Sequence, residues 1–507
     1  MNEPSPRTLS IALADEAATA RLMADLALLI RAGDVITLSG ELGTGKTAAA
    51  RAMIRHLAQD GTLDVPSPTF TLAQTYELAT IPVLHADLYR IADTRELEEL
   101  GLAPLPDNLL VLLEWPERAA NELPADRIEI VLSMQPERGA DARLATVTGH
   151  GAAEAKVVRL GQLRDFLGRA GFLEAQRLYM PGDASTRSYA RLVREGTSTI
   201  LMNFPPRVDQ QRIYGGRSYL AAVHLADEIK PFVAIARGLQ ERGFSAPAVY
   251  HCDLERGFLI GEDLGTEAFV EGNPPRPIVP RYEAAIDVLA ELHRLELPTA
   301  LAVEGASAHA IAAFDVDAML IELSLLLDWY FPDRGLAVTD TMRAEFDALW
   351  RALLTPILQG PRTWVIRDYH SPNLIWLEQR SGIAKVGIID FQDMVLGPAA
   401  YDVVSLAQDA RLDIAEPVEL ALLSRYVRNR RAREDGFDPT AFAESYAVMS
   451  AQRNTRLLGV FSRLNRRDGK PHYLRHQPRI WTYLARSLAH PALATVKDWY
   501  GRHLPPD

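Results

Sequence analysis

The chain has 507 residues, a formal net charge of −12, 48% apolar residues and 24% charged residues. This length predicts roughly two or three domains, and the acidic balance argues against strong, direct binding of nucleic acid. The single cysteine, Cys252, excludes an internal disulfide, and no apolar run is long enough for a signal peptide or a membrane span, so we expect a cytoplasmic protein with no membrane contact.

Short apolar strands alternate with amphipathic helices over residues 1–150, which predicts an α/β domain. Helices are predicted at Asp15–Arg31 and Thr47–Gln59. Strands are predicted at Val35–Ser39, Thr71–Glu77, Val83–Asp87, Leu109–Glu114, Arg127–Leu132 and Leu144–Thr148. The small residues from Gly149 to Ala155 then indicate a linker, which we place at 151–157.

The turn between the strand Val35–Ser39 and the next helix reads Gly-Glu-Leu-Gly-Thr-Gly-Lys-Thr. A strand, this turn and a helix form a P-loop, in which backbone N–H groups and the helix N-terminus bind phosphates. We therefore expect an ATP site with Mg²⁺, where Lys46 reaches the β- and γ-phosphates as a catalytic residue and Thr47 ligates the metal ion. A glycine-rich turn with a surface lysine is the alternative. The predicted nucleotide-binding residues are Gly40, Glu41, Leu42, Gly43, Thr44, Gly45, Lys46 and Thr47.

Three further segments follow the P-loop in order: Ser67–Leu72, His85–Arg90 and Glu114–Pro116. With the P-loop they resemble the TsaE family, the ATPase subunit of the bacterial machinery that makes threonylcarbamoyladenosine in tRNA, over about residues 8–150. The resemblance implies TsaB- and TsaD-like partner subunits, metal ligands at Glu114 and Thr69, and a catalytic Asp87 that orients the attacking water. It also puts Trp115 beside the nucleotide. The alternatives are a surface acid at Glu114, a turn cap at Asp87 and a core position for Trp115.

Residues 158–507 predict a second, α+β domain with two lobes. We expect a small β-rich lobe over 158–265 and a larger helical lobe over 266–507. The small lobe has a predicted helix at Gln162–Ala170 and strands at Arg187–Arg194, Thr197–Phe204, Ala248–Cys252 and Gly257–Glu262. The large lobe has predicted helices at Arg281–Leu295, Ala312–Leu327 and Thr341–Leu358, and strands at Ile375–Leu377 and Val386–Ile389.

A second set of chemical residues lies in the large lobe. Asp368 and Asn373 have the Asp-x-x-x-x-Asn spacing of protein-kinase-like enzymes, in which the Asp accepts the substrate hydroxyl proton and the Asn binds Mg²⁺. The strand Val386–Ile389 ends in Asp390, which would supply another metal ligand, and Asp402 is placed to support the catalytic loop. The sequence thus predicts a second ATP and Mg²⁺ site, with Asp368 as catalytic base and Asn373 and Asp390 as metal ligands.

These motifs resemble the aminoglycoside phosphotransferase superfamily over about residues 160–500. The segment Pro181–Tyr189 is similar to the nucleotide-covering loop of the AmgK branch, whose members phosphorylate the anomeric hydroxyl of N-acetylmuramate and N-acetylglucosamine in cell-wall recycling. The resemblance implies a bilobal kinase fold with a hinge at Glu262–Gly265. The nucleotide-binding residues that it implies are Gly182, Asp183, Ala184, Ser185, Arg187, Glu262 and Leu264.

One position departs from the kinase pattern. The strand Thr197–Phe204 carries Met202 where kinases have a lysine that pairs with the α- and β-phosphates. No lysine can replace it by a small shift, because none lies between 157 and 229. We expect Arg187 or Arg191 to supply the charge, since an arginine fork also binds phosphate, though with different geometry. A degraded, inactive kinase is the alternative.

The sequence therefore predicts a bifunctional protein. An α/β P-loop ATPase for tRNA threonylcarbamoyladenosine formation precedes a kinase that phosphorylates a sugar hydroxyl. Two alternatives remain open for the second domain: an acceptor such as an aminoglycoside, choline or another small alcohol, or a role as a non-catalytic, nucleotide-binding regulator.

Overall fold

A computed structural model describes residues 8–91, 96–97, 105–119, 122–181, 187–206 and 212–504 of the chain. The chain divides into two compact units. The first comprises Met1–Pro205 and Tyr250–Asp263, and the second comprises Pro206–Val249 and Leu264–Asp507. The first unit thus joins the residues of the predicted P-loop domain to most of those of the predicted small lobe.

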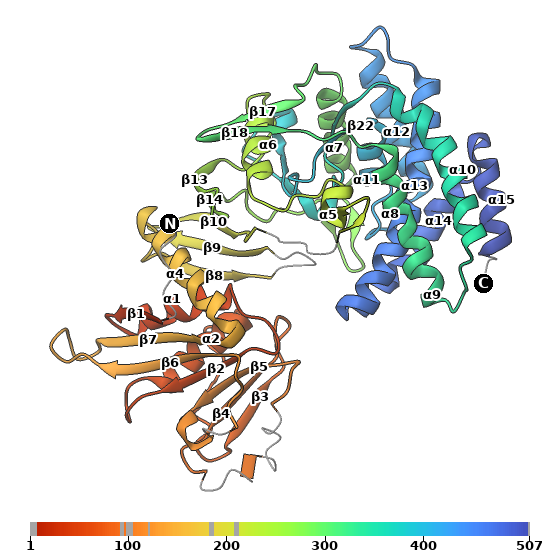
Figure 1. Cartoon of the computed structure of the whole chain (residues 1–507). Coiled ribbons are helices and arrows are strands. Elements are labelled where there is room, and N and C mark those ends of the chain that lie inside the picture. The colour runs from red at the N-terminus through yellow and green to blue at the C-terminus, as the bar shows by residue number, and fades with distance from the viewer. Residues whose placement is uncertain are drawn as a thin grey trace. The chain divides into compact units, whose positions relative to one another are not determined.

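The P-loop part of the first unit is built on a seven-stranded sheet with the order β1-β7-β6-β2-β5-β4-β3 (Figure 1). Its centre is parallel, because β2 pairs with β5 and β6, and β5 pairs with β4. Its outer pairs, β1 with β7, β7 with β6 and β4 with β3, are antiparallel. The strands are β1 (Thr8–Leu13), β2 (Val35–Ser39), β3 (Ala73–Tyr76), β4 (Val83–Asp87), β5 (Leu110–Glu114), β6 (Arg127–Met134) and β7 (Arg143–His150).

Two helices pack on each other beside this sheet. Helix α1 (Glu16–Ala27) begins after Asp15, whose carboxylate caps it by accepting a hydrogen bond from Ala18 N at 2.7 Å. Helix α2 (Lys46–Ala58) begins within the P-loop. Apolar residues of both helices join those of β2, β5 and β6 in one core. The predicted α/β fold is confirmed, with every predicted strand present and β1 added.

The second sheet of the first unit has five strands in the order β13-β14-β10-β9-β8, and the pairs from β14 to β8 are antiparallel. One face of this sheet packs against α4, through Phe166 of the helix and Leu201 of β10 among others. Strand β8 was not predicted; the other four agree with the predicted strands to within two residues. The elements are α4 (Glu154–Arg169), β8 (Gln176–Met180), β9 (Ser188–Arg194), β10 (Thr197–Asn203), β13 (Val249–Asp253) and β14 (Phe258–Glu262).

The expected linker at 151–157 is not an extended connection. Gly151–Ala153 form a 3-10 helix, and Glu154 begins α4, which starts eight residues before the predicted helix at Gln162. Val157 and Leu160 of α4 are buried in the core of the seven-stranded sheet, whereas Leu163 and Phe166 are buried in the core of the five-stranded sheet. The small residues serve a tight turn: Gly151 has φ +56°, and a Cβ there would lie 2.1 Å from Asp126 Oδ1.

Within the first unit, a buried ion pair also joins helix α1 of the P-loop part to strand β8 of the five-stranded sheet. Asp25 of α1 accepts a hydrogen bond from Arg177 Nε of β8 at 2.8 Å, and both side chains are fully buried. Arg164 of α4 contacts the other carboxylate oxygen of Asp25 at 2.7 Å. One carboxylate of the P-loop part therefore contacts two guanidinium groups from the other part.

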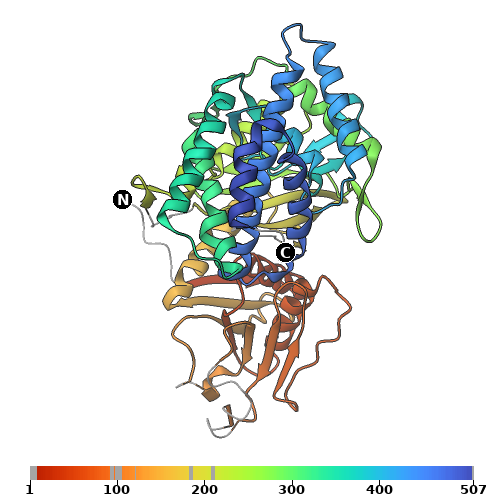
Figure 2. The ribbon, with the colours of Figure 1, turned by 90° about the vertical axis from the view of Figure 1, so that its right-hand side faces the viewer.

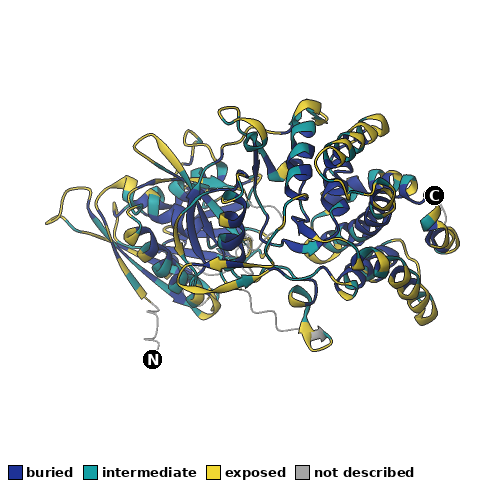
Figure 3. Ribbon diagram, turned by 90° about the horizontal axis from the view of Figure 1, so that it is seen from above, coloured by how far each residue is buried: buried dark blue, intermediate teal, exposed yellow. Residues whose placement is uncertain are grey.

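The second unit is mainly helical, with its helices packed side by side (Figure 2). The long helix α13 packs against α8, α11 and α14, and the helices are buried on their inner sides and exposed outside (Figure 3). No helix among the described residues is long and apolar enough to cross a membrane. The main helices are α6 (Lys230–Gln240), α7 (Val279–Leu292), α8 (Val316–Leu325), α10 (Asp340–Gln359), α11 (Ala400–Ala407), α12 (Glu416–Arg431), α13 (Pro439–Asp468), α14 (Gln477–Ser487) and α15 (Ala494–His503).

We predict that Asp25→Ala lowers the free energy of unfolding by about 3–5 kcal/mol, because it leaves the Arg177 guanidinium buried without its counter-charge. Chemical denaturation of the full chain measures this loss. Arg21→Ala is the matched control, because it removes the exposed ion pair between Arg21 and Glu174, which joins the same two regions and is worth about 1 kcal/mol or less. Equal losses for the two variants would contradict the assigned importance of the buried pair.

Candidate functional sites

The P-loop lies between β2 and α2 and bends sharply around its glycines. Gly40 has φ +137°, and a Cβ on it would lie 2.3 Å from Leu132 O, so no larger residue fits there. The Lys46 ammonium donates hydrogen bonds to Gly40 O at 2.8 Å and Glu41 O at 2.9 Å, and it lies 3.8 Å from the centre of the Trp115 ring. Burial lowers the pKa of Lys46, against the opposing pull of Glu114 and other acids nearby.

Glu114 at the end of β5 connects the P-loop helix to β4. Its Oε2 accepts a hydrogen bond from Thr47 Oγ1 at 2.9 Å, and its Oε1 lies 2.9 Å from His85 Nε2. Glu114 and His85 are both buried, so the surface-acid interpretation of Glu114 is wrong. The sequence did not predict a role for His85, because nothing in the pattern of an apolar strand indicates which residue a histidine within it will contact.

Asp87 is the neighbour of Glu114 across the parallel pair β4–β5. Its Oδ2 accepts hydrogen bonds from Thr69 Oγ1 at 2.7 Å and Ser67 Oγ at 3.1 Å, and its Oδ1 accepts one from Tyr89 N at 3.0 Å. Asp87 therefore caps a turn, as the alternative interpretation held, and also ties the Thr69 segment to the edge of the sheet that carries the P-loop.

Trp115 takes a backbone conformation that is uncommon outside glycine, with φ +58°. Its ring is only partly buried, lies under the Lys46 ammonium and contacts the Tyr89 ring at 5.0 Å between centroids. Trp115 also packs against the buried apolar residues of β4 and β5, so it is both a neighbour of that core and a contact of Lys46. The predicted residues Lys46, Thr47 and Glu114 therefore lie close together in the first site.

The second site lies in the second unit, around the short 3-10 helix Ser371–Asn373. Asn373 Nδ2 donates to Asp368 O at 2.9 Å and lies 3.4 Å from Asp390 Oδ2, so the three predicted residues meet. Gln392 Nε2 donates to Asp390 Oδ1 at 3.0 Å. Arg367 and Asp390 have φ +71° and +59°, a strained arrangement that is concentrated at functional sites.

The loop that carries Asp368 is held by Asp402 at the start of α11. Its fully buried carboxylate accepts hydrogen bonds from Ile366 N at 2.7 Å and Arg367 N at 2.9 Å. Ser405 Oγ donates to Arg367 O at 3.1 Å. The predicted supporting role of Asp402 is confirmed by these bonds, which fix the backbone immediately before Asp368.

Arginines of α13 surround the Asp368 carboxylate. Arg453 lies 3.7 Å from Asp368 Oδ1, and Arg456 pairs at 3.1 Å with Glu322, which also pairs with Arg367. Burial alone would raise the pKa of Asp368, but Arg456 and Arg453 are among the positive groups that lower it to about 2. Asp368 is therefore ionised at neutral pH. These α13 arginines were missed, because on a helix they look like an ordinary charged stripe.

His370 is buried beside Asp368, with 3.9 Å between its Nε2 and Asp368 Oδ1. Burial and the neighbouring Arg411 lower its pKa to about 4, so His370 is neutral at pH 7. Tyr369 is buried and donates to Ala285 O of α7 at 3.0 Å, which makes it part of the packing of the loop.

The predicted nucleotide residues of the small lobe are only partly described. Gly182, Asp183, Ala184 and Ser185 lie outside the described residues. Arg187 lies over the Phe204 ring at 5.5 Å. Glu262 ends β14 in register with Thr199 of β10. Leu264, the first residue of the second unit's second segment, is buried.

Comparison with known proteins identifies both parts of the chain. Residues 13–142 match the family described as threonylcarbamoyl adenosine biosynthesis protein TsaE, and residues 179–438 match the phosphotransferase enzyme family. An N-acetylmuramate/N-acetylglucosamine kinase from Caulobacter vibrioides is 36% identical over 354 residues, which are 67% of this chain and 95% of that protein. A protein of the same name from Pseudomonas aeruginosa is 30% identical over 64% of this chain and 87% of its own length. The TsaE protein of Rickettsia felis is 36% identical over 25% of this chain and 72% of its own length.

The chain belongs to the TsaE family in its N-terminal part and to the phosphotransferase enzyme family in its C-terminal part. The expected fusion is thereby confirmed. The TsaE part is an ATPase domain and the phosphotransferase part is a kinase domain, so the protein is a bifunctional enzyme that uses ATP.

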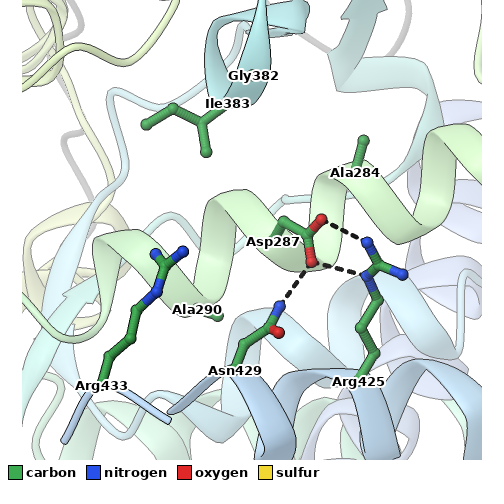
Figure 4. Close-up of a pocket in the computed structure, with 8 residues that line it drawn as sticks. All are labelled: Ala284, Asp287, Ala290, Gly382, Ile383, Arg425, Asn429 and Arg433. Carbon is green, nitrogen blue, oxygen red and sulfur yellow. Dashed lines mark hydrogen bonds and ion pairs between the residues drawn. The ribbon is translucent and has the colours of Figure 1, made fainter.

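A separate polar pocket of about 310 Å³ lies between α7 and α12 of the phosphotransferase part (Figure 4). Asp287 of α7 faces Arg425 and Asn429 of α12 there, with contacts of 2.7 and 2.6 Å. None of the predicted site residues lines this pocket. Asp287, Arg425 and Asn429 bind one another, so we interpret the pocket as part of the contact between the two helices.

We predict that Asp402→Asn lowers kcat of phosphoryl transfer by about 10- to 100-fold, through misplacement of the loop that carries Asp368. An asparagine amide has an NH₂ group, so one of the two backbone N–H groups would face another donor. Steady-state kinetics of the full chain measure the loss. Asp413→Asn, which breaks an exposed ion pair with Arg479 in the same unit, is the control. Comparable losses in the two variants would remove the special role of Asp402.

Proposed function

We propose that the phosphotransferase part transfers the γ-phosphoryl group of ATP to the anomeric hydroxyl of N-acetylmuramate or N-acetylglucosamine, as a step of cell-wall recycling. The relatives from Caulobacter and Pseudomonas carry the name of such a kinase, and the first is matched over nearly its whole length. The observation that carries the proposal is the meeting of Asp368, Asn373 and Asp390 in one site with kinase spacing.

In this proposal Asp368 accepts the proton of the sugar hydroxyl. Its side chain is 33% exposed and its low pKa keeps it deprotonated, so it is accessible and in the form that can accept a proton. Asn373 and Asp390 would hold Mg²⁺, because carboxylate and amide oxygens suit this hard ion and its other ligands come from phosphates and water. Bound Mg²⁺ supplies neutralisation of the phosphate charge.

We propose that the TsaE part hydrolyses ATP, with Mg²⁺, in the formation of tRNA threonylcarbamoyladenosine. Thr47 Oγ1 and Glu114 Oε2 lie 2.9 Å apart, close to the spacing of about 3 Å between adjacent oxygens of an octahedral Mg²⁺ site. These two residues would hold the ion, and Lys46 would bind the phosphates. Asp87 would orient the attacking water, and Thr69, which is hydrogen-bonded to it, would complete the metal surroundings.

The TsaE part would act in the cytoplasm with other subunits of the threonylcarbamoyl transferase machinery. Two exposed large apolar side chains support a protein partner: Leu42 within the P-loop is 83% exposed, and Phe70, the neighbour of Thr69, is 85% exposed. Exposed apolar groups at a functional site are typical of contact surfaces. TsaB- and TsaD-like proteins are the proposed partners, because the family named for this part works in that pathway.

We predict that Asp368→Asn lowers kcat of sugar phosphorylation by about 10²- to 10⁴-fold, the usual contribution of a general base. Radiolabelled ATP with a panel of N-acetylmuramate, N-acetylglucosamine, aminoglycosides and choline measures it on the full chain. Retained activity in the variant would contradict the assignment of Asp368. Phosphorylation of only another alcohol would replace the proposed acceptor, and turnover with none of them would favour a regulator.

We predict that Glu114→Gln abolishes most ATP hydrolysis by the TsaE part, by about 10²-fold or more, because the metal-side carboxylate is lost. Hydrolysis is measured with and without TsaB- and TsaD-like proteins, while sugar phosphorylation by the same variant should stay unchanged. Glu129→Gln is the matched control, because Glu129 lies on β6 of the same sheet and pairs with His150. Normal hydrolysis in Glu114→Gln would contradict the assigned site.

A further inference from the structure

A buried arginine of α13 faces the predicted catalytic base of the phosphotransferase part. Arg453 is 2% exposed, and its Nε makes no hydrogen bond within the described part of the chain. Its guanidinium forms an ion pair with Asp368, in which Nη2 lies 3.7 Å from Oδ1, a distance longer than a hydrogen bond. Burying a guanidinium group is costly unless it is paired and hydrogen-bonded. Packing alone therefore does not account for a charged side chain at this position.

The second buried carboxylate of this cluster, Glu322 of α8, is engaged by other arginines. It pairs with Arg367 and, at 3.1 Å, with Arg456. Arg456 lowers the pKa of Asp368 more than Arg453 does, but the Arg456 guanidinium is held by Glu322. Arg453 is thus the arginine of α13 that forms its ion pair with the catalytic base itself.

The Asp368 carboxylate has room for a ligand. Its side chain is 33% exposed, and the hydrogen bond from Asn373 goes to its backbone oxygen. Among the residues that the structure describes, none donates a hydrogen bond to either carboxylate oxygen. His370 lies 3.9 Å from the same oxygen as Arg453 and is neutral at pH 7. A hydroxyl group can therefore donate its proton to Asp368 with Arg453 directly beside it.

The chemistry of phosphoryl transfer places the moving phosphoryl group next to Asp368. A hydroxyl that donates to Asp368 lies about 2.7 Å from a carboxylate oxygen. Before attack, the same hydroxyl oxygen lies about 3–3.5 Å from the γ-phosphorus. The three outer oxygens of the phosphoryl group carry the negative charge of the transition state. A guanidinium 3.7 Å from Asp368 Oδ1 is within reach of these oxygens, and its planar fork of N–H donors matches them.

We infer that Arg453 binds the phosphoryl group during its transfer and stabilises the negative charge of the transition state. This inference rests on the proposed kinase function and adds a catalytic residue to that site. In the reaction the sugar oxygen forms a bond to the γ-phosphorus, and the hydroxyl proton passes to Asp368. The bond from this phosphorus to the ADP oxygen breaks, and its electron pair goes to ADP. Arg453 stays protonated throughout, and no bond to it forms or breaks.

In the full chain, Arg453→Met should lower kcat of sugar phosphorylation by about 10²- to 10³-fold, the value of one hydrogen-bond donor to a transition state. The loss should be equal for N-acetylmuramate and N-acetylglucosamine, because both accept the same phosphoryl group. The KM values for ATP and for the sugar should change by about threefold or less, because a contact made only in the transition state leaves substrate binding intact. Radiolabelled sugar phosphate reports the phosphotransferase site alone.

A second readout separates the transition state from the bound substrates. ADP with aluminium fluoride mimics the phosphoryl group in transfer, and it inhibits sugar phosphorylation as a transition-state analogue. In Arg453→Met its inhibition constant should rise by about 10²- to 10³-fold, in parallel with the loss of kcat. Inhibition by ADP alone should stay unchanged, because ADP lacks the transferred group.

Arg453→Lys is the second variant, because it keeps a positive charge beside Asp368 but lacks the planar fork. It should lose about tenfold in kcat with both sugars, and it carries the test if Arg453→Met does not fold. Arg486→Met is the matched control, because Arg486 of α14 pairs at 2.6 Å with the buried Glu419 elsewhere in the same unit. It should leave kcat and both inhibition constants unchanged.

Unchanged kcat in the folded Arg453 variants overturns the inference. A loss confined to N-acetylmuramate also overturns it, because Arg453 would then bind the carboxylate of that sugar. Recovery of kcat at alkaline pH overturns it as well, since Arg453 would only keep Asp368 ionised. So does equal weakening of inhibition by ADP with and without aluminium fluoride. Absence of sugar phosphorylation by the unchanged chain is a separate result, which contradicts the proposed function, and the inference with it, before any variant is compared.

Discussion

One helix is shared by two hydrophobic cores, and the architecture of the first unit depends on it. The first turns of α4 bury Val157 and Leu160 against the seven-stranded sheet, and its later turns bury Phe166 and Leu167 against the five-stranded sheet. A helix can do this only if apolar side chains line one of its faces along its whole length. Burial of each large apolar side chain stabilises the fold by about 1.5–3 kcal/mol, and both cores gain from it. The segment that connects the TsaE part to the phosphotransferase part is therefore a helix that belongs to both cores.

Buried carboxylates organise both sites. Glu114 fixes the first turn of α2 through Thr47, and Asp402 fixes the loop that carries Asp368 through two backbone N–H groups. A buried carboxylate is stable only when its oxygens are satisfied, so each of these residues is locked into one arrangement. The same physics applies to Asp25 between α1 and β8. In each case a costly charge brings together segments that are distant in the sequence.

Much of the fold follows from local pattern, and the exceptions have physical causes. Glycines, apolar strands and the P-loop are local signals, and the strands β2, β4 and β5 were predicted to within a residue. Strand β8 was missed because its buried residue is Arg177, whose partner Asp25 is 152 positions away. Strand β1 lies at the sheet edge with only two buried residues, so its alternation is faint. The glycines before α4 suggested a linker, but Gly149 is needed because a Cβ there would lie 2.6 Å from Glu154 Cα.

The residues of the two sites also divide into those that a local sequence pattern predicts and those that it does not. Lys46, Thr47, Asp368 and Asn373 belong to compact motifs, and the residues that meet in each site were largely identified from spacing. His85, Glu322 and Arg453 were not, because their roles depend on contacts that only the folded chain creates.

Residues of the TsaE part contact strands of the five-stranded sheet. The Caulobacter relative is covered over 95% of its length by 67% of this chain, so the phosphotransferase part has a counterpart without a TsaE part. In this chain, however, Arg177 of β8 is buried against Asp25, and Ser188 at the start of β9 is bound to Leu28 O. Both partners belong to the TsaE part. A buried guanidinium needs its counter-charge, so the burial of Arg177 in β8 depends on Asp25 of α1. Ser188 is held by Leu28, the residue that follows α1, so the TsaE part is a structural component of the five-stranded sheet.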